Sequence, residues 1–316
     1  MPEKSIDAAV ARATAGKRLV LAVSGGADSM VLLDAAARVA GDRVAAVATF
    51  DHGTGPAARV AVELVRAEAE ARGLPVVVGH ASGLPATEAA WRAARWAFLR
   101  SSACRYDAVV ATGHTQDDQV ETVFIRLLRD TGPRGMAALY TDSDVVRPLL
   151  AVSGEAIDRY VVSNGIRYVD DPSNRSRTYL RNRVRLDLLP AVRRVRPEFD
   201  AELLELAAQA AEWRRGLERQ LEECCPMQAM ADGMSVAAAD LAGYDPETLS
   251  VVWPVLAARA GVRLDRRGTS RLTAFTFTAK VGGTIQLSGR VEVVRSRFLF
   301  VFRNTPTAHR GRASAS

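Results

Sequence analysis

The chain of 316 residues contains little cysteine, little lysine and no long apolar run. Its three cysteines, Cys104, Cys224 and Cys225, form no Cys-x-x-Cys pair. This scarcity argues against a disulfide framework and against a zinc or iron–sulfur site built from cysteines alone. No apolar stretch approaches the ~18 residues that a membrane span requires, and the N-terminal residues lack the pattern of a signal peptide. We therefore expect a cytoplasmic protein without a membrane partner.

Basic charge is abundant although lysine is scarce. The only lysines are Lys4, Lys17 and Lys280, yet the formal net charge is +6 and the pI about 9.6, because the chain is rich in arginine. A basic balance favours a polyanionic partner. The length and the 48% hydrophobic content suffice for one large domain or two ordinary ones with real cores.

A strand, a glycine turn and a helix are predicted in succession near the N-terminus. The apolar run 19–23 predicts a buried strand, Ser24-Gly25-Gly26 interrupts it, and residues 30–37 resume with the apolar pattern of a helix. This geometry directs backbone N–H groups and a helix N-terminus at an anion. The two glycines lack the Cβ atoms that would hold a phosphate away from the backbone.

Three side chains strengthen the phosphate interpretation of this turn. Ser24 and Ser29 supply hydroxyl donors, and Asp28 places a carboxylate where a Mg²⁺ ion bridging phosphates would need one. The stretch has neither the Gly-Lys-Ser/Thr of a Walker loop nor the Gly-x-Gly-x-x-Gly of a dinucleotide site. A purely structural glycine turn is the alternative, but these residues together, between a strand and a helix, favour phosphate binding.

Predicted strands and helices alternate over the first 130 residues. The strands are expected at 19–23, 43–50, 76–78 and 107–113, and the helices at 5–15, 57–72, 87–104 and 116–129. Such alternation predicts an α/β fold whose parallel sheet is covered on both faces and binds ligands beyond the carboxyl ends of its strands. Ser24, Asp51 and His114 all lie just beyond predicted strand ends.

The pattern changes after about residue 140. An extended piece is expected at 147–150, and helices at 153–165, 179–189 (ending at Pro190), 197–223, 246–260 and 267–280. Strands are expected at 283–288 and at 291–303, the latter as two strands with a turn near Ser296. Residues 225–235 read as a break. We therefore expect a catalytic domain at 1–196, a helical linker at 197–226, a small α/β domain at 227–304 and a disordered tail at 305–316.

Acidic residues cluster where the predicted helix 116–129 begins. Asp117 lies beside Asp118, and Asp118 shares a helix face with Glu121 at the i, i+3 spacing. Acids at a helix N-terminus can simply complement the helix dipole. At the same edge of the sheet as the glycine turn, however, these carboxylates could hold Mg²⁺ or accept a hydrogen bond from a nucleobase.

Arginines concentrate in two further stretches. Arg92 and Arg95 share one face of the predicted helix 87–104, which is either solvated or brings an arginine to phosphate or substrate. Residues 172–197 hold eight arginines against one acid, Asp187. A solvated face is the simpler explanation, but this density favours contact with a nucleic-acid backbone. These arginines are Arg175, Arg177, Arg181, Arg183, Arg185, Arg193, Arg194 and Arg196.

The glycine turn resembles the pyrophosphate loop (PP-loop) of the N-type ATP pyrophosphatases, and the chain as a whole resembles the tRNA(Ile)-lysidine synthetases among them. The matching stretches are 24–29, 51–53, 88–95, 113–122, and 147–150 together with 171–174 and 181–185. They span about residues 18–196, and residues 200–303 resemble the family's substrate-binding domain more weakly.

The resemblance implies a PP-loop catalytic domain, a helical linker and a small α/β tRNA-binding domain. It also implies an ATP- and Mg²⁺-dependent reaction. The wobble cytidine of tRNA(Ile) with a CAU anticodon is adenylated at its C2 oxygen with loss of pyrophosphate. The amine of free L-lysine then attacks C2, AMP leaves, and the product is lysidine.

The resemblance also suggests residue roles. ATP would be bound by Ser24, Gly25, Gly26, Ala27, Asp28, Ser29, Asp51, His52 and His114, with Asp28 also holding Mg²⁺. Asp118 and Glu121 would recognise the cytosine, because carboxylates accept a hydrogen bond from its exocyclic amine. Arg92 would act on AMP or the activated base. The tRNA phosphates would be bound by Arg175, Arg177, Arg181, Arg183, Arg185, Arg193 and Arg194.

Two positions depart from the family pattern. Thr54-Gly55 follows His52-Gly53 where the family usually has Leu-Arg. Asp130 follows Arg129 where the family usually has the glycine of Arg-Gly-Ser/Thr-Gly, so the resemblance carries no tRNA contact over to these two loops. The further C-terminal domain of longer members is not expected here. A tRNA 2-thiolase, which would need cysteines near the site, a tRNA-binding protein with an inactive loop, and a small-molecule amide synthetase are the alternatives. The sequence leaves the oligomeric state open, a homodimer included.

Overall fold

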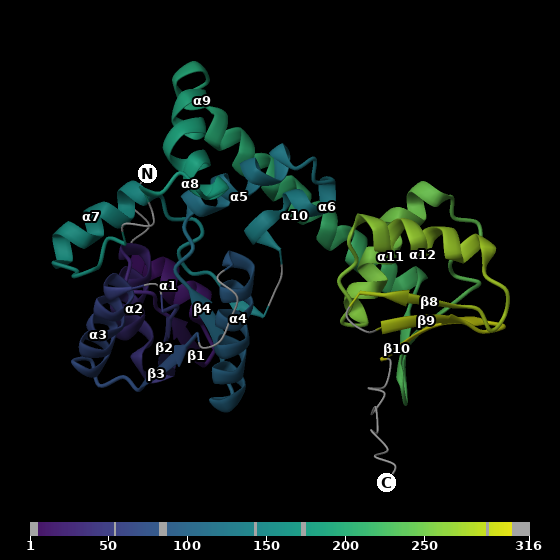
Figure 1. Cartoon of the computed structure of the whole chain (residues 1–316), viewed down its shortest axis with the longest axis horizontal. Coiled ribbons are helices and arrows are strands. Elements are labelled where there is room, and N and C mark those ends of the chain that lie inside the picture. The colour runs from purple at the N-terminus through teal and green to yellow at the C-terminus, as the bar shows by residue number, and fades with distance from the viewer. Residues whose placement is uncertain are drawn as a thin grey trace, which may run out of the picture. The chain divides into compact units, whose positions relative to one another are not determined.

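The computed structural model describes residues 6–53, 55–81, 87–141, 144–171, 175–288 and 291–304 (Figure 1). The chain divides into two compact units, Met1–Ala211 and Glu212–Ser316. The long helix α10 (Phe199–Cys224) contains the point of division. The tail expected at 305–316, Thr54, and residues 172–174 lie outside the described residues.

Five parallel strands form the sheet of the first unit, in the order β3-β2-β1-β4-β5. Their bounds are Leu19–Ala22 (β1), Val44–Asp51 (β2), Val76–His80 (β3), Val109–Thr112 (β4) and Val145–Val146 (β5). This parallel sheet confirms the predicted α/β fold. The extended piece expected at 147–150 is displaced, because pairing with β4 stops at Val146 and a turn follows.

Helices cover both faces of this sheet. They are α1 (Ile6–Thr14), α2 (Ala27–Ala40), α3 (Pro56–Glu70), α4 (Glu88–Arg105) and α7 (Gly154–Asn164). Two further helices, α5 (Gln116–Leu128) and α6 (Pro133–Met136), pack in a separate core. Alternate residues of β1 face opposite ways: Leu19 and Leu21 pack with α1, α2, α3 and α7, whereas Val20 packs with α4. Burial on both faces explains the continuous apolar run that marks this strand.

The helix predicted at 179–189 does not end at Pro190. It runs as α8 (Leu180–Arg183), a π-helical stretch (Val184–Leu188) and α9 (Leu189–Val195), with Pro190 in the first turn of α9. The π-helical stretch rearranges the hydrogen bonds just where proline lacks an N–H, so the helix continues. Val184 and Leu189 pack in a core that α5 and the first half of α10 complete.

The second unit holds an antiparallel sheet, in the order β6-β7-β10-β9-β8. Its elements are β6 (Met227–Met230), β7 (Gly233–Ala237), α11 (Pro246–Arg259), α12 (Arg266–Thr278), β8 (Thr284–Leu287), β9 (Val291–Arg295) and β10 (Leu299–Asn304). Figure 1 shows α11 and α12 beside one another over this sheet. Trp253 of α11 lies in the core between these helices and the sheet, and its ring centroid is 5.4 Å from that of Phe300 in β10.

The hairpin formed by β6 and β7 was missed from sequence, where residues 225–235 read as a break. Few residues in this hairpin are β-branched, so local propensity for a strand is weak. Pairing decides instead: Val236 lies opposite Phe300 of β10, more than sixty positions away.

Candidate active site

The glycine turn lies at the carboxyl end of β1 and leads into α2. Gly26 is the N-cap residue of α2, and no side chain caps the first turn. The turn is braced by its serines: the backbone N–H of Ser24 donates to Ser29 Oγ at 3.1 Å, and Ser29 Oγ donates to the carbonyl of Gly26 at 2.8 Å. The N–H groups of the first turn of α2 therefore face outward without a side-chain acceptor, as an anion site requires.

Two glycines allow the surrounding elements to approach this turn. Gly25 has φ of +89°, and a Cβ there would lie 2.8 Å from the Cβ of Ala61 in α3. Gly113 follows β4, and a Cβ there would lie 2.9 Å from the carbonyl oxygen of Asp28. Both glycines are therefore needed for close packing around the turn, which a larger residue would push apart.

The order of the strands places this turn at a switch point of the sheet. The chain passes from β1 outward to β2 and β3, and then returns to β4 on the other side of β1. In open parallel sheets the crevice at such a point binds the ligand. Ser24 follows β1, and His114 follows β4, so both flank this crevice, whereas Asp51 and His52 lie at the end of β2.

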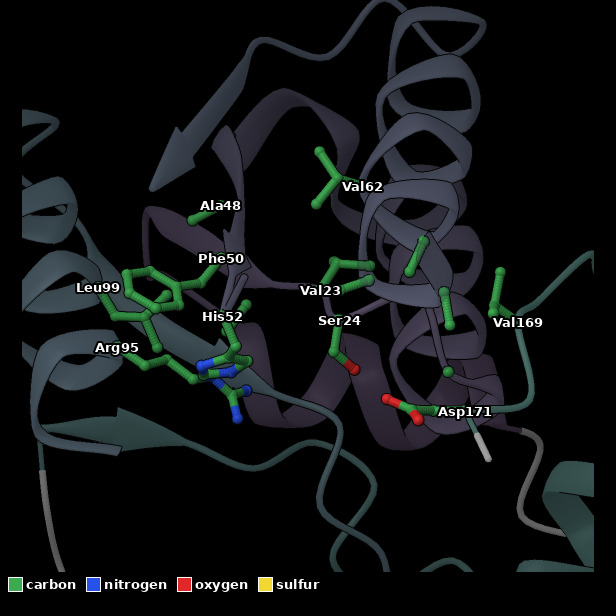
Figure 2. A pocket seen from close by; sticks show the side chains of 15 residues that line it. Val23, Ser24, Ala48, Phe50, His52, Val62, Arg95, Leu99, Val169 and Asp171 are labelled. Atoms are coloured by element: carbon green, nitrogen blue, oxygen red, sulfur yellow. The ribbon is translucent and has the colours of Figure 1, made fainter. Parts of the chain in front are cut away.

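A pocket opens beside the glycine turn, as Figure 2 shows. Most of its lining residues have apolar side chains, and Ser24, His52, Arg95 and Asp171 add polar groups, so polar and apolar atoms share the lining about equally. The lining residues are Ala22, Val23, Ser24, Gly26, Ala48, Phe50, His52, Ala57, Ala58, Ala61, Val62, Arg95, Leu99, Val169 and Asp171. A pocket with apolar side chains and several polar groups, next to an anion site, has the character of a nucleoside pocket.

His52 and Arg95 are the two nitrogen-bearing side chains that line this pocket, and Figure 2 shows them side by side. Burial and the nearby Arg95 lower the pKa of His52, so its ring is neutral at pH 7. Its Nδ1 atom is buried and has no hydrogen-bond partner among the described residues. Burial, and next the nearby Arg92, lower the pKa of Arg95. Both groups have hydrogen-bonding capacity left for a ligand.

Arg95, rather than Arg92, lines the pocket, whereas Arg92 is exposed. The spacing of the two arginines indicated a shared face of α4 but not which one points inward. Asp51 is turned away as well: its Oδ1 accepts from the backbone N–H of Gly53 at 2.7 Å and closes the turn after β2. His52 is therefore the residue of this pair that reaches the pocket.

Asp28 and His114 both carry strongly shifted pKa values. Burial, followed by the neighbouring Asp118, raises the pKa of Asp28 to about 6, although Arg185 opposes the shift. Burial lowers the pKa of His114 to about 4, with Asp118 opposing. His114 Nδ1 lies 2.7 Å from Thr112 Oγ1, which orients the ring. At pH 7 the site thus combines an ionised carboxylate, whose charge is disfavoured by its surroundings, with a neutral imidazole.

Glu121 is held by two arginines from the arginine-rich segment, defined as residues 175–196. Its side chain is only 3% exposed, Arg181 Nε donates to Oε2 at 3.1 Å, and Arg185 donates to both oxygens. Arg181 also donates to Thr122 Oγ1 at 2.8 Å. Both oxygens of Glu121 are therefore occupied by guanidinium groups, which fix α8 and the π-helical stretch against α5.

The other two predicted acids of α5 have different partners. Asp118 Oδ2 accepts from the backbone N–H of Thr115 at 3.1 Å in a capping box, and Oδ1 lies 3.5 Å from Arg185. Asp117 Oδ2 accepts from the backbone N–H of Gly154 at 3.1 Å and so links the starts of α5 and α7. The structure therefore brings Asp118 and Glu121 together with Arg185, near Asp28.

Most arginines of the arginine-rich segment have carboxylate partners. Arg175 pairs with Asp170, Arg177 with Asp187, Arg193 with Asp200 and Arg196 with Glu202. Arg183 and Arg194 are exposed and make no ion pair within the part of the chain that the structure describes. These two are the arginines most available to phosphates.

No preformed metal cage is found: the described residues contain no group of three or more His, Cys, Asp and Glu side chains suited to a metal ion. Within the same residues no helix has the length and apolarity to cross a membrane.

Comparisons with known proteins agree with this geometry. A family model described as a PP-loop domain matches residues 2–192. The tRNA(Ile)-lysidine synthase of Salinispora arenicola is 35% identical over 295 residues, which cover 88% of each chain. That of Burkholderia mallei is 37% identical over 213 residues, 63% of this chain but only 43% of the relative. A solved U34-tRNA thiolase from Methanococcus maripaludis shares the fold, with a TM-score of 0.55, 13% identity, and 66% of this chain and 78% of that one covered.

Proposed function

We propose that this chain, which belongs to the tRNA(Ile)-lysidine synthase family of PP-loop proteins, joins free L-lysine to the wobble cytidine of CAU-anticodon tRNA(Ile). It is an ATP-dependent ligase. The cytidine C2 oxygen attacks the α-phosphate of ATP and releases pyrophosphate, and the lysine amine then displaces AMP from C2. Positioning and charge stabilisation do most of the catalytic work in such a reaction.

The observation that carries this proposal is the uncapped start of α2 behind Ser24-Gly25-Gly26, beside a pocket lined by apolar and polar groups. The N–H groups there suit the phosphates of ATP, together with the hydroxyl of Ser24. The pocket beside them suits the adenosine. Neutral His52 offers an unpartnered nitrogen to a base or ribose, and Arg95 offers a cation to the α-phosphate or to AMP. Arg95 thus takes the role first expected of Arg92.

Asp28 is the residue that we propose to hold Mg²⁺. The ion commonly binds one or two carboxylates together with substrate phosphates, so the lack of a three-residue cage among the described residues is compatible with it. When bound, Mg²⁺ neutralises charge on the phosphates. A nearby cation also favours the ionised form of Asp28, whose pKa burial raises to about 6.

For the cytosine we propose Asp118 as the acceptor of its exocyclic amine. Asp118 is partly accessible and retains lone pairs beyond its bonds to Thr115 and Arg185. Glu121 has both oxygens occupied, so we assign it the positioning of Arg181 and Arg185. The exposed Arg183 and Arg194 are the proposed contacts to tRNA phosphates in this unit, with the paired arginines as weaker ones.

The test is attachment of radiolabelled lysine to a CAU isoleucine tRNA transcript, with ATP and Mg²⁺. We expect incorporation that depends on ATP and disappears when the wobble C is replaced by U. A transcript that accepts no lysine, while another acceptor is modified, would refute the proposal. Thiolation is the alternative to check with a sulfur donor in place of lysine. Of the three cysteines, Cys104 lies in α4, and Cys224 and Cys225 lie in the second unit.

A further inference from the structure

The second unit carries a basic helix face on which most cations form no ion pair among the described residues. Residues 263–281 hold five basic side chains and one acid, Asp265. Asp265 is the N-cap residue of α12, where its Oδ1 accepts from the backbone N–H of Gly268 at 2.6 Å. The acid of this segment therefore caps the backbone of α12. Of the five cations Arg266 has an interaction partner, and the other four form no ion pair among the described residues.

The exposed face of α12 follows the helical repeat. Arg267, Arg271, Ala274 and Thr278 are spaced i, i+4, i+7 and i+11 and are all exposed. The opposite face is anchored in the core through Leu272 and through Thr276, whose hydroxyl accepts from Trp253 Nε1 at 2.8 Å. The core thus fixes the rotation of α12 and keeps this face directed to solvent.

Four cations on and beside this face have no partner in the part of the chain that the structure describes. Among the described residues, Arg263, Arg267, Arg271 and Lys280 are exposed and form no ion pair. Phe277, 57% exposed, borders the same stripe one turn before Lys280. We call Arg263, Arg267, Arg271, Phe277 and Lys280 the α12 surface.

We propose that the α12 surface binds the phosphate backbone of RNA, with Phe277 stacking on an unpaired base. Free guanidinium groups along one helix face match the spaced negative charges of a nucleic-acid backbone, and they release counterions on binding. An exposed aromatic ring beside them is the arrangement that supports base stacking. This inference rests on the proposed tRNA substrate and adds a contact to it outside the PP-loop unit.

The chain offers a matched control within the same unit. Residues 212–224 of α10 hold four acids and three arginines, so this helix is close to neutral. Arg215 and Arg219 are exposed, four positions apart and without an ion pair among the described residues. Arg215→Gln with Arg219→Gln therefore removes the same charge, at the same spacing, from a surface that we do not propose to bind RNA.

The experiment measures binding of the full chain to a CAU isoleucine tRNA transcript by filter retention, at several salt concentrations. We expect Arg267→Gln with Arg271→Gln to weaken binding about tenfold at low salt and to reduce the salt slope by about two, while the control variant changes neither. Phe277→Ser should weaken binding about tenfold with an unchanged slope, because stacking releases no counterions. Circular dichroism confirms that each variant is folded.

Three outcomes would overturn the inference. If Arg267→Gln/Arg271→Gln binds with the same affinity and salt slope as the wild type, the α12 surface does not contact phosphate. If the control variant loses as much affinity, the loss reflects only the net charge of the chain. Unchanged RNA binding with lost binding to poly-L-glutamate would assign the surface to an acidic polypeptide. Filter binding requires no turnover, so a chain that attaches no lysine but shows these losses would refute the proposed reaction and leave the α12 surface standing.

Discussion

The arginine-rich segment of the first unit and the α12 surface of the second are both basic, but they differ in whether their basic side chains form ion pairs. In residues 175–196, six of eight arginines have carboxylate partners. On the α12 surface, Arg263, Arg267, Arg271 and Lys280 have none among the described residues. Arginine density alone would rank the first region as the main RNA contact. Pairing shows that much of its charge holds the protein together.

The pairing has a structural purpose in the first unit. Arg181 and Arg185 reach Glu121 on α5 from sixty or more positions along the chain, and so attach the arginine-rich segment to the helix that borders the site. The α12 surface needs no such anchor, because Trp253 and Leu272 already fix its helix. Charge that is paired orders the site, and charge that is unpaired is available to a ligand.

The largest effect is expected at Asp28, a partly buried carboxylate that makes no hydrogen bond or ion pair among the described residues. Its pKa is about 6 in the folded chain, above the ordinary 3.8. Its ionisation therefore costs folding free energy that grows as pH rises from about 4 to 6 and reaches about 3 kcal/mol above that. Asp28→Asn should stabilise the apo chain by up to about that amount at pH 7, not at pH 4, and abolish lysine attachment.

Urea unfolding at the two pH values, without ATP or Mg²⁺, measures this effect. Asp42→Asn, at a side chain that is 83% exposed, is the control and should change little at either pH. Equal destabilisation of Asp28→Asn at both pH values would show that Asp28 is a structural residue, and retained activity would refute its metal role.

A smaller effect, a loss of folding stability, is expected when Glu121 no longer pairs with the two arginines that it holds. Glu121→Gln leaves Arg181 and Arg185 close together without their carboxylate. Removing one partner of a buried pair destabilises strongly, but the arginines are 38% and 45% exposed, so we expect about 2 kcal/mol. Urea unfolding measures the loss, and Glu202→Gln, which unpairs the exposed Arg196, is the matched control.

The cause of that loss can be separated from simple disruption of packing. If unpaired cations are responsible, adding Arg181→Gln and Arg185→Gln to Glu121→Gln should recover part of the stability. A triple variant that is less stable than Glu121→Gln would contradict the electrostatic account.

These contrasts mark what the sequence could and could not predict. The glycine turn and the parallel sheet were readable because motif, apolar runs and strand-to-helix order are local signals. The choice between Arg92 and Arg95 was not, since helical spacing gives a shared face but not its orientation. The pairing of Glu121 with Arg181 is a tertiary contact across about sixty residues, and the free face of α12 becomes visible only once its buried face is known.

The two arginines left free in the arginine-rich segment allow the comparison to be tested within one region. Arg183→Gln with Arg194→Gln should weaken tRNA binding about tenfold and lower the salt slope by about two. Arg175→Gln with Arg177→Gln removes equal charge from paired arginines and should lower the slope by less than one, because each carboxylate already offsets its arginine. Equal salt slopes for the two variants would show that a carboxylate partner does not decide whether an arginine contacts tRNA phosphates.

Removing the carboxylate partner of a paired arginine should make that arginine available to tRNA phosphates. We expect this to be the smallest effect of the series. Arg177 donates to both oxygens of Asp187 and both side chains are exposed, so Asp187→Asn frees the arginine without burying a charge. We expect tighter tRNA binding and a salt slope steeper by up to about one, because a further cation can then displace counterions. Adding Arg177→Gln to Asp187→Asn should remove the gain. Tighter binding that survives this second change would exclude Arg177 as the cause and attribute the effect to lost repulsion between Asp187 and phosphate or to Arg183, whose charge also acts on Asp187.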